Sequence, residues 1–183
     1  MVMPGGGPVA DGPIGDAPHV FSARFNLEPV GPGDSIIQIA SFIDRALIAR
    51  LQQYPEDLRI IDRRKFEQLV AELFAGFGYA IELTQRTRDG GKDIIAIKRR
   101  EVDVKFLIEC KRPDPGNPVG VSTVRELYGT KCDDGASKAI LATTTYFSPD
   151  AKLFSDRHRW ELELKDFDAI RGWIDDYMKG KAV

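Results

Sequence analysis

The sequence has few of the residues that build zinc-bound or disulfide-linked domains. It contains only two cysteines and two histidines in 183 residues. Cys110 and Cys132 are too far apart in the sequence to form a CxxC pair, and neither histidine is close to them, which argues against a structural zinc site. Reduced thiols fit this pattern best, so we expect a cytoplasmic protein.

The chain also lacks the net positive charge that is typical of a nucleic-acid-binding protein. Its 26 Lys and Arg residues are balanced by 28 Asp and Glu residues, so any nucleic-acid site must be a local patch. No long apolar run is present, because charged residues interrupt the most apolar stretch, 36–51. The first residues do not resemble a secretory signal, and we expect no membrane contact.

The composition favours one packed domain with an extension. Hydrophobic residues make up 43% of the chain and charged residues 30%, as in globular proteins, and the length suits a single core. Residues 1–34 hold six of the eleven prolines and seven of the 17 glycines, which predicts a flexible extension. Apolar residues at helical spacing after Ser35 predict an N-terminal helix over 35–53 that docks on the core or on a partner. The domain itself is expected over 54–183.

From Asp62 onward, helical and strand-like patterns alternate. Asp62 is a good helix cap, and the apolar stripe that follows ends at Gly78. Three short strand-like runs come next, and because short turns join them they should pair antiparallel. The expected elements are a helix over 62–78, strands over 79–84, 93–98 and 105–111, a helix over 121–131, a strand over 138–144, a helix from about 149, a strand over 160–164 and a helix over 166–178. The core order is therefore αβββαβ.

Chemically useful residues stand at the end of the third strand. Side chains alternate along a strand, so Glu109 and Lys111 share one face while Cys110 points to the opposite, core face. If the preceding hairpin turns near Glu101, Asp93 lies opposite Glu109 on the neighbouring strand. Strands are about 4.8 Å apart, so the two carboxylates can hold one divalent metal, with the Cys110 carbonyl as a further ligand. A register slip of one residue would instead turn Asp93 to the wrong face.

Such a constellation suits phosphodiester hydrolysis. Acid or base help from one side chain gives a rate gain on the order of 10² to 10⁴, which is far less than demanding hydrolyses require. A bound cation lowers the pKa of its water and neutralises the charge that develops on the phosphoryl group. Lys111 would orient the attacking water or stabilise the developing negative charge.

These residues carry a resemblance to a known family. The segments DGGKDIIAIK, FLIECKR, VRELYG and ILATTTYFSPDA resemble the Mrr-type restriction endonuclease-like family of the PD-(D/E)xK nuclease superfamily, over about residues 54–164. The resemblance implies an α/β fold with a mixed central sheet flanked by helices, and DNA cleavage with magnesium, for which manganese is a substitute. It places Asp93, Glu109 and Lys111 in the catalytic positions, although many relatives have glutamine where Glu109 stands. It also makes Glu67 a candidate outer ligand or partner of a metal-bound water.

Basic residues gather around the same site. The segment from Arg86 to Arg112 holds nine basic and five acidic residues, a net charge of +4. Within it Arg86, Arg88, Lys92 and Arg112 are predicted to contact DNA phosphates, unless they form only a solubilising face.

Simpler interpretations remain for the acidic residues. Glu109 and Lys111 would otherwise be an exposed ion pair worth about 0 to 1 kcal/mol. Glu67 would otherwise be a solvated glutamate beside an apolar stripe.

The sequence therefore favours a magnesium-dependent endodeoxyribonuclease acting in defence against phage, foreign or modified DNA. The alternative is a catalytically inert DNA-binding or assembly module of the same fold, and a third hypothesis is a nuclease for branched DNA or RNA. DNA is the expected partner, together with a second copy of the chain or a partner subunit that contacts the N-terminal helix.

Overall fold

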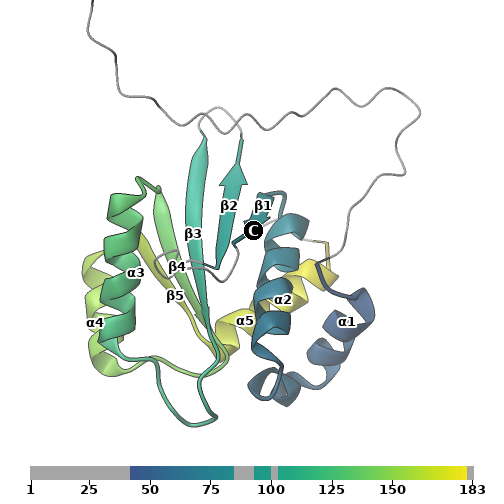
Figure 1. Ribbon diagram of the computed structural model, residues 1–183. Coiled ribbons are helices and arrows are strands. Elements are labelled where there is room, and N and C mark those ends of the chain that lie inside the picture. Colours follow the sequence, from purple (N-terminus) through teal and green to yellow (C-terminus); the bar gives the residue numbers. More distant parts are fainter. Residues whose placement is uncertain (1–41, 85–92, 100–102, 181–183) are drawn as a thin grey trace, which may run out of the picture. The chain divides into compact units, whose positions relative to one another are not determined.

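The computed structural model describes residues 42–84, 93–99 and 103–180, and five strands within them form one sheet in the order β1-β2-β3-β4-β5 (Figure 1). The strands are β1 (Ala80–Leu83), β2 (Ile94–Lys98), β3 (Val104–Lys111), β4 (Lys138–Thr143) and β5 (Leu162–Lys165). Strands β1, β2 and β3 pair antiparallel, whereas β4 pairs parallel with both β3 and β5. The predicted mixed sheet and its αβββαβ order are confirmed.

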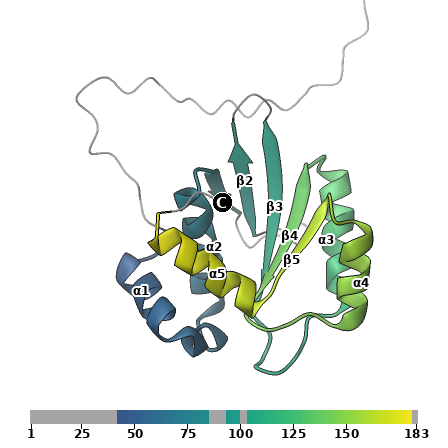
Figure 2. The same ribbon diagram turned by 180° about the vertical axis from the view of Figure 1, so that it is seen from behind.

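Helices cover both faces of this sheet (Figures 1 and 2). The helices are α1 (Arg45–Gln53), the 3₁₀ helix η1 (Pro55–Arg59), α2 (Arg63–Gly76), α3 (Val121–Asp133), α4 (Pro149–Arg157) and α5 (Phe167–Met178). One apolar cluster joins α1, α2 and α5 to the face that carries Ile108 and Cys110. A second cluster joins α3 and α4 to the opposite face, through Leu141 and Leu162. Core packing therefore continues on the face of Glu109, which the sequence analysis did not foresee.

Helix α2 forms where the sequence predicts a helix. The Asp62 carboxylate accepts hydrogen bonds from the backbone N–H groups of Arg64 and Lys65, at 2.9 and 3.1 Å, and so satisfies two donors of the first turn. The apolar stripe that starts at Phe66 is fully buried under the sheet. Gly78 follows the helix with φ of +85°, a conformation that glycine adopts without strain.

The N-terminal helix begins later than predicted. Helix α1 starts at Arg45 because the Asp44 carboxylate accepts the N–H of Ala46 at 2.8 Å, whereas Ser35 and residues up to 41 lie outside the described part of the chain. The sequence allows the N-terminal helix to dock on the core or on a partner. In the structure α1 packs on the core.

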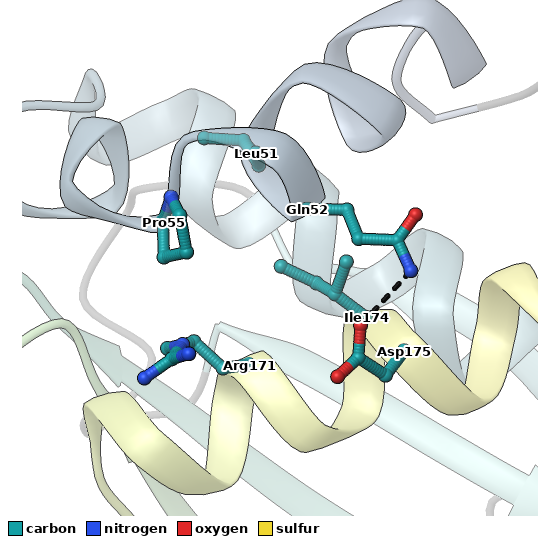
Figure 3. A pocket seen from close by; sticks show the side chains of 6 residues that line it. All are labelled: Leu51, Gln52, Pro55, Arg171, Ile174 and Asp175. Carbon is teal, nitrogen blue, oxygen red and sulfur yellow. Dashed lines mark hydrogen bonds between the residues drawn. The ribbon is translucent and has the colours of Figure 1, made fainter.

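Helix α1 packs against α5 (Figure 3). Leu51 is 1% exposed, and the side-chain amide of Gln52 donates to the Asp175 carboxylate at 2.9 Å. The hollow left between the two helices is only about 30 Å³. None of the helices in the described ranges is long and apolar enough to cross a bilayer.

A buried carboxylate connects α2 to α5. Glu72 is 5% exposed, and its two oxygens accept the Tyr177 hydroxyl and the backbone N–H of Phe42, each at 2.8 Å. This bond holds the Tyr177 ring directly over Gly76, where a Cβ atom would collide with two ring carbons.

We therefore expect Gly76→Ala to destabilise the domain by about 1–3 kcal/mol, because the tethered ring cannot move aside without cost. The matched control is Gly172→Ala in α5, where an added Cβ meets nothing within 4 Å. That substitution should stabilise by about 0.5–1 kcal/mol through helix propensity. Chemical denaturation measures both changes, and equal stabilisation by the two alanines would contradict the packing described.

Candidate active site

The register of β2 and β3 brings Asp93 beside Glu109. Pairing runs from Lys98 with Val104 to Ile94 with Ile108, and Asp93, the residue before Ile94, is hydrogen-bonded to Ile108 and Cys110, the residues on either side of Glu109. The pairs are symmetrical about position 101, which agrees with the predicted register of these two strands, and residues 100–102 themselves lie outside the description.

Two hydrogen bonds attach Asp93 to β3. Its backbone N–H donates to the carbonyl of Ile108 at 3.0 Å, and its carboxylate oxygen Oδ2 accepts the backbone N–H of Cys110 at 2.7 Å. Thr84, which follows β1, donates from both its N–H and its hydroxyl to the Asp93 carbonyl, at 3.0 and 3.2 Å. Asp93 is thus held between the ends of β1 and β3.

Glu109 and Lys111 form a close ion pair at the end of β3. Lys111 Nζ lies 2.5 Å from Glu109 Oε1. The glutamate side chain is 5% exposed and that of the lysine 34%, so the ammonium lies between a buried carboxylate and solvent. This burial is inconsistent with the alternative of an ordinary exposed ion pair.

Burial changes the acidity of both carboxyl groups. It raises the pKa of Asp93, against the hydrogen bond from Cys110, and the negative charge of Glu67 raises it further. Burial also raises the pKa of Glu109, against the hydrogen bond from Lys111, and the charge of Asp93 adds to the rise. Two buried carboxyl groups with raised pKa values, one of them raised in part by the charge of the other, form a site that a cation would stabilise.

Cys110 faces the candidate site with its backbone, whereas its sulfur lies in the core. Its side chain is fully buried in the core, and burial raises the pKa of the thiol well above its usual value. The thiolate that a metal or an electrophile would need is therefore disfavoured. Because the N–H and C=O of one strand residue point to the same side, the Cys110 carbonyl is directed toward Asp93, as its N–H is.

Glu67 is buried, so the interpretation as a solvated glutamate is wrong. It is 1% exposed on α2 and pairs with two arginines one turn earlier. Arg64 Nη1 lies 2.7 Å from Glu67 Oε2, and Arg63 Nε lies 3.4 Å from Oε1. Neither arginine is among the predicted site residues, although the run Arg63, Arg64, Lys65 at a helix start is a visible signal. Packing of α2 on the sheet brings this group near Asp93, whose pKa the charge of Arg63 lowers.

The predicted phosphate-binding residues are only partly located. Arg86, Arg88 and Lys92 lie in the segment 85–92, outside the described ranges. Arg112 is half-buried, and its Nη1 donates to the carbonyl of Arg59 at 3.5 Å. In the described part of the chain its buried Nε has no hydrogen-bond partner.

The donor set resembles a magnesium site that the substrate completes. Among the described residues, no three His, Cys, Asp or Glu side chains lie close enough to bind a metal by themselves. The available donors are the two carboxylates of Asp93 and Glu109 and the carbonyl of Cys110, which are all hard oxygen atoms. Mg²⁺ is commonly held by one or two carboxylates, waters and substrate phosphates, so these residues fit the ion.

Comparison of sequences identifies relatives of this chain. The sequence model of a restriction endonuclease family (Mrr_cat) matches residues 58–174. The uncharacterised protein y4cE of Sinorhizobium fredii is 29% identical over 138 residues, which is 74% of this chain and 35% of that protein. The chain thus spans about a third of the length of this curated relative.

Solved structures share the fold. The DNA modification-dependent restriction endonuclease AspBHI matches with a TM-score of 0.55 and 21% identity, over 80% of this chain and 40% of its own. The restriction endonuclease MspJI, in complex with a 27-mer oligonucleotide, matches with a TM-score of 0.52 and 17% identity, over 72% and 32%. The restriction endonuclease FokI matches with a TM-score of 0.50 and 11% identity, over 72% and 28%. At these identities the likeness concerns the fold alone.

The raised pKa of Asp93 predicts a gain in stability for Asp93→Asn. The pKa of the Asp93 carboxyl group is higher in the folded protein than in the unfolded chain, so protonation of this group stabilises the fold below about pH 4. This stabilisation is lost as the pH rises through the pKa of the folded state. Asparagine removes the charge, and its amide oxygen can still accept the Cys110 N–H. In chelator at about pH 7 we expect a higher Tm, by about 2–4 °C for each kcal/mol gained.

Thermal unfolding at about pH 4 and pH 7 checks this. The advantage of Asp93→Asn over wild type should shrink at the lower pH, and Asp114→Asn, at an exposed loop residue, should change the Tm little. A lower Tm for Asp93→Asn at both pH values would contradict the electrostatic account.

Proposed function

The chain belongs to the restriction endonuclease family whose sequence model spans residues 58–174, and from this membership we propose that it is a magnesium-dependent endodeoxyribonuclease. The observation that carries the proposal is the meeting of Asp93, Glu109 and Lys111 at one end of adjacent strands. Two carboxylates beside an ammonium group are the groups that one metal ion and one phosphodiester group require.

Asp93, Glu109 and the Cys110 carbonyl would hold the metal. Bound there, Mg²⁺ or Mn²⁺ supplies Lewis-acid polarisation of the phosphoryl oxygen and lowers the pKa of a bound water. The protein itself holds the metal-binding oxygen atoms in position before a metal binds. The Cys110 N–H holds the Asp93 carboxylate in place, and burial of Glu109 keeps its carboxylate from being fully hydrated.

Lys111 supplies positive charge at the reacting centre. Its ammonium group lies against Glu109 and is one-third exposed, so a phosphate that reaches the site meets a cation already in place. A fixed ammonium costs little reorganisation when negative charge develops on the phosphoryl oxygens. Lys111 therefore orients the attacking water or stabilises that charge.

The structural relatives bear on the substrate and on the biological role. AspBHI is described as DNA modification-dependent, and MspJI was solved with an oligonucleotide. We propose modified or foreign duplex DNA as the substrate, with a role in cytoplasmic defence. Simultaneous cleavage of both strands by a core with a single site calls for two copies, so we also propose that the protein acts as a homodimer. Competition between duplex, branched DNA and RNA separates the substrate classes.

One observation favours the alternative of an inert DNA-binding or assembly module. Lys111 Nζ is paired with Glu109 at 2.5 Å, and a metal that binds Glu109 must compete with this ion pair. A protein in which the pair never opened would bind DNA without cutting it. Salt-sensitive DNA binding without cleavage in any divalent metal would support this second function.

Cleavage of supercoiled plasmid in Mg²⁺ tests the first function. Asp93→Ala and Lys111→Ala should each lower the nicking rate about 10²–10³-fold, because each removes a group that acts on the transition state. Chelator should abolish nicking by the wild type, and Mn²⁺ should restore it.

The matched control is Lys105→Ala. Lys105 lies on the same strand face as Lys111, its side chain is similarly exposed at 35%, and it pairs with Asp134 at 2.7 Å. Its loss should leave the nicking rate within about threefold of wild type, as expected of a surface ion pair. Equal nicking by wild type, Asp93→Ala and Lys111→Ala would reject the assignment.

A further inference from the structure

The first turn of α2 carries positive charge where helices normally avoid it. Arg63, Arg64 and Lys65 occupy its first three positions, and the turn contains no acidic residue. The amino end of a helix is itself positive, so each cation there is unfavourable by about 0.3–1 kcal/mol. A cluster that opposes the helix dipole is explained if it binds an anion.

Glu67 forms ion pairs with two of these cations, Arg63 and Arg64. It accepts Arg64 Nη1 at 2.7 Å on Oε2 and lies 3.4 Å from Arg63 Nε on Oε1. Glu67 Oε1 is buried and has no hydrogen-bond partner within the described ranges, since the contact with Arg63 is an ion pair only. Each guanidinium carries five N–H donors, and the contact with Glu67 occupies one nitrogen of each. The arginine side chains are 46% and 45% exposed, so their remaining donors are accessible to an anion.

The cluster lies near the candidate active site. Helix α2 packs against β2 and β3, and the charges of Glu67 and Arg63 both act on Asp93, the first raising its pKa and the second lowering it. A basic surface beside a metal-binding carboxylate is well placed for phosphates next to the one that is cut.

The charge balance supports the same conclusion. The carboxylates of Asp93, Glu109 and Glu67 are matched by Lys111, Arg63 and Arg64, so these six groups have no net charge. One divalent cation would bring the sum to +2. Without the two arginines, the metal-loaded site would be neutral and would have no attraction for the DNA backbone beyond the metal itself.

We propose that Arg63 and Arg64 bind backbone phosphates of DNA next to the scissile phosphate, and that buried Glu67 is the positioning residue that holds both guanidinium groups. This inference rests on the proposed function. It assigns Glu67 a role through the arginines, in place of the role of outer metal ligand.

DNA binding without metal tests the inference separately from cleavage. The full chain is titrated into a short fluorescein-labelled duplex in chelator, and the affinity is followed against salt concentration by anisotropy. Arg63→Ala and Arg64→Ala should each weaken binding whatever the DNA sequence and should each reduce the salt slope by about 1. The control Arg157→Ala removes an exposed arginine from the last turn of α4 and should leave the slope unchanged.

Glu67→Gln distinguishes the two roles of the glutamate. Removal of a negative charge alone would tighten DNA binding, whereas loss of a positioning residue weakens it. We expect weaker metal-free DNA binding and unchanged Mn²⁺ affinity by calorimetry, with partial rescue of DNA binding by Glu67→Asp. Tighter DNA binding together with a large loss of Mn²⁺ affinity would overturn the positioning role and favour a metal-linked one.

The arginine variants decide the inference even if Glu67→Gln fails to fold. Salt slopes equal to wild type in Arg63→Ala and Arg64→Ala, or no salt-dependent binding by the wild type, would overturn it. A reduced salt slope in both variants, with no plasmid cleavage by the wild type, would support phosphate binding by the arginines and reject the nuclease function.

Discussion

The hydrogen bond from the backbone N–H of Cys110 to the Asp93 carboxylate determines the geometry of the whole site. Cys110 stands between Glu109 and Lys111, so the strand that holds Asp93 also presents the second carboxylate and the ammonium group. Thr84 extends the connection to β1 by two further bonds to the Asp93 carbonyl. A shift of one residue between β2 and β3 would break these relations together, because it would turn Asp93 to the opposite face.

The site is electrostatically unfavourable when considered alone. Asp93, Glu109 and Glu67 are buried or partly buried carboxylates, and burial of a charge is costly unless an opposite charge or a hydrogen bond accompanies it. Lys111, Arg63 and Arg64 compensate at close range. Proteins tolerate such local costs where a site needs charge in a fixed position, and the rest of the fold supplies the stability.

Much of this arrangement follows from local rules. Alternation along β3 places Glu109 and Lys111 on one face, and the pairing of β2 with β3 brings Asp93 to the same end of the sheet, so both features could be predicted from the sequence. The burial of Glu67 could not, because it depends on how α2 docks on the sheet, and a helical stripe does not set the docking angle or depth. The start of α1 was also missed. Asp44 and Ser35 are both good caps, and local preference does not decide between them.

Direct location of a bound cation tests the central claim of two carboxylates that share one metal. Crystals of the wild type soaked in Mn²⁺ can be examined by anomalous diffraction. The account predicts a peak within about 2.0–2.4 Å of an oxygen of Asp93 and of an oxygen of Glu109, with Lys111 Nζ moved away from Glu109. A peak elsewhere, or none at saturating Mn²⁺ with the Lys111–Glu109 pair intact, would contradict it.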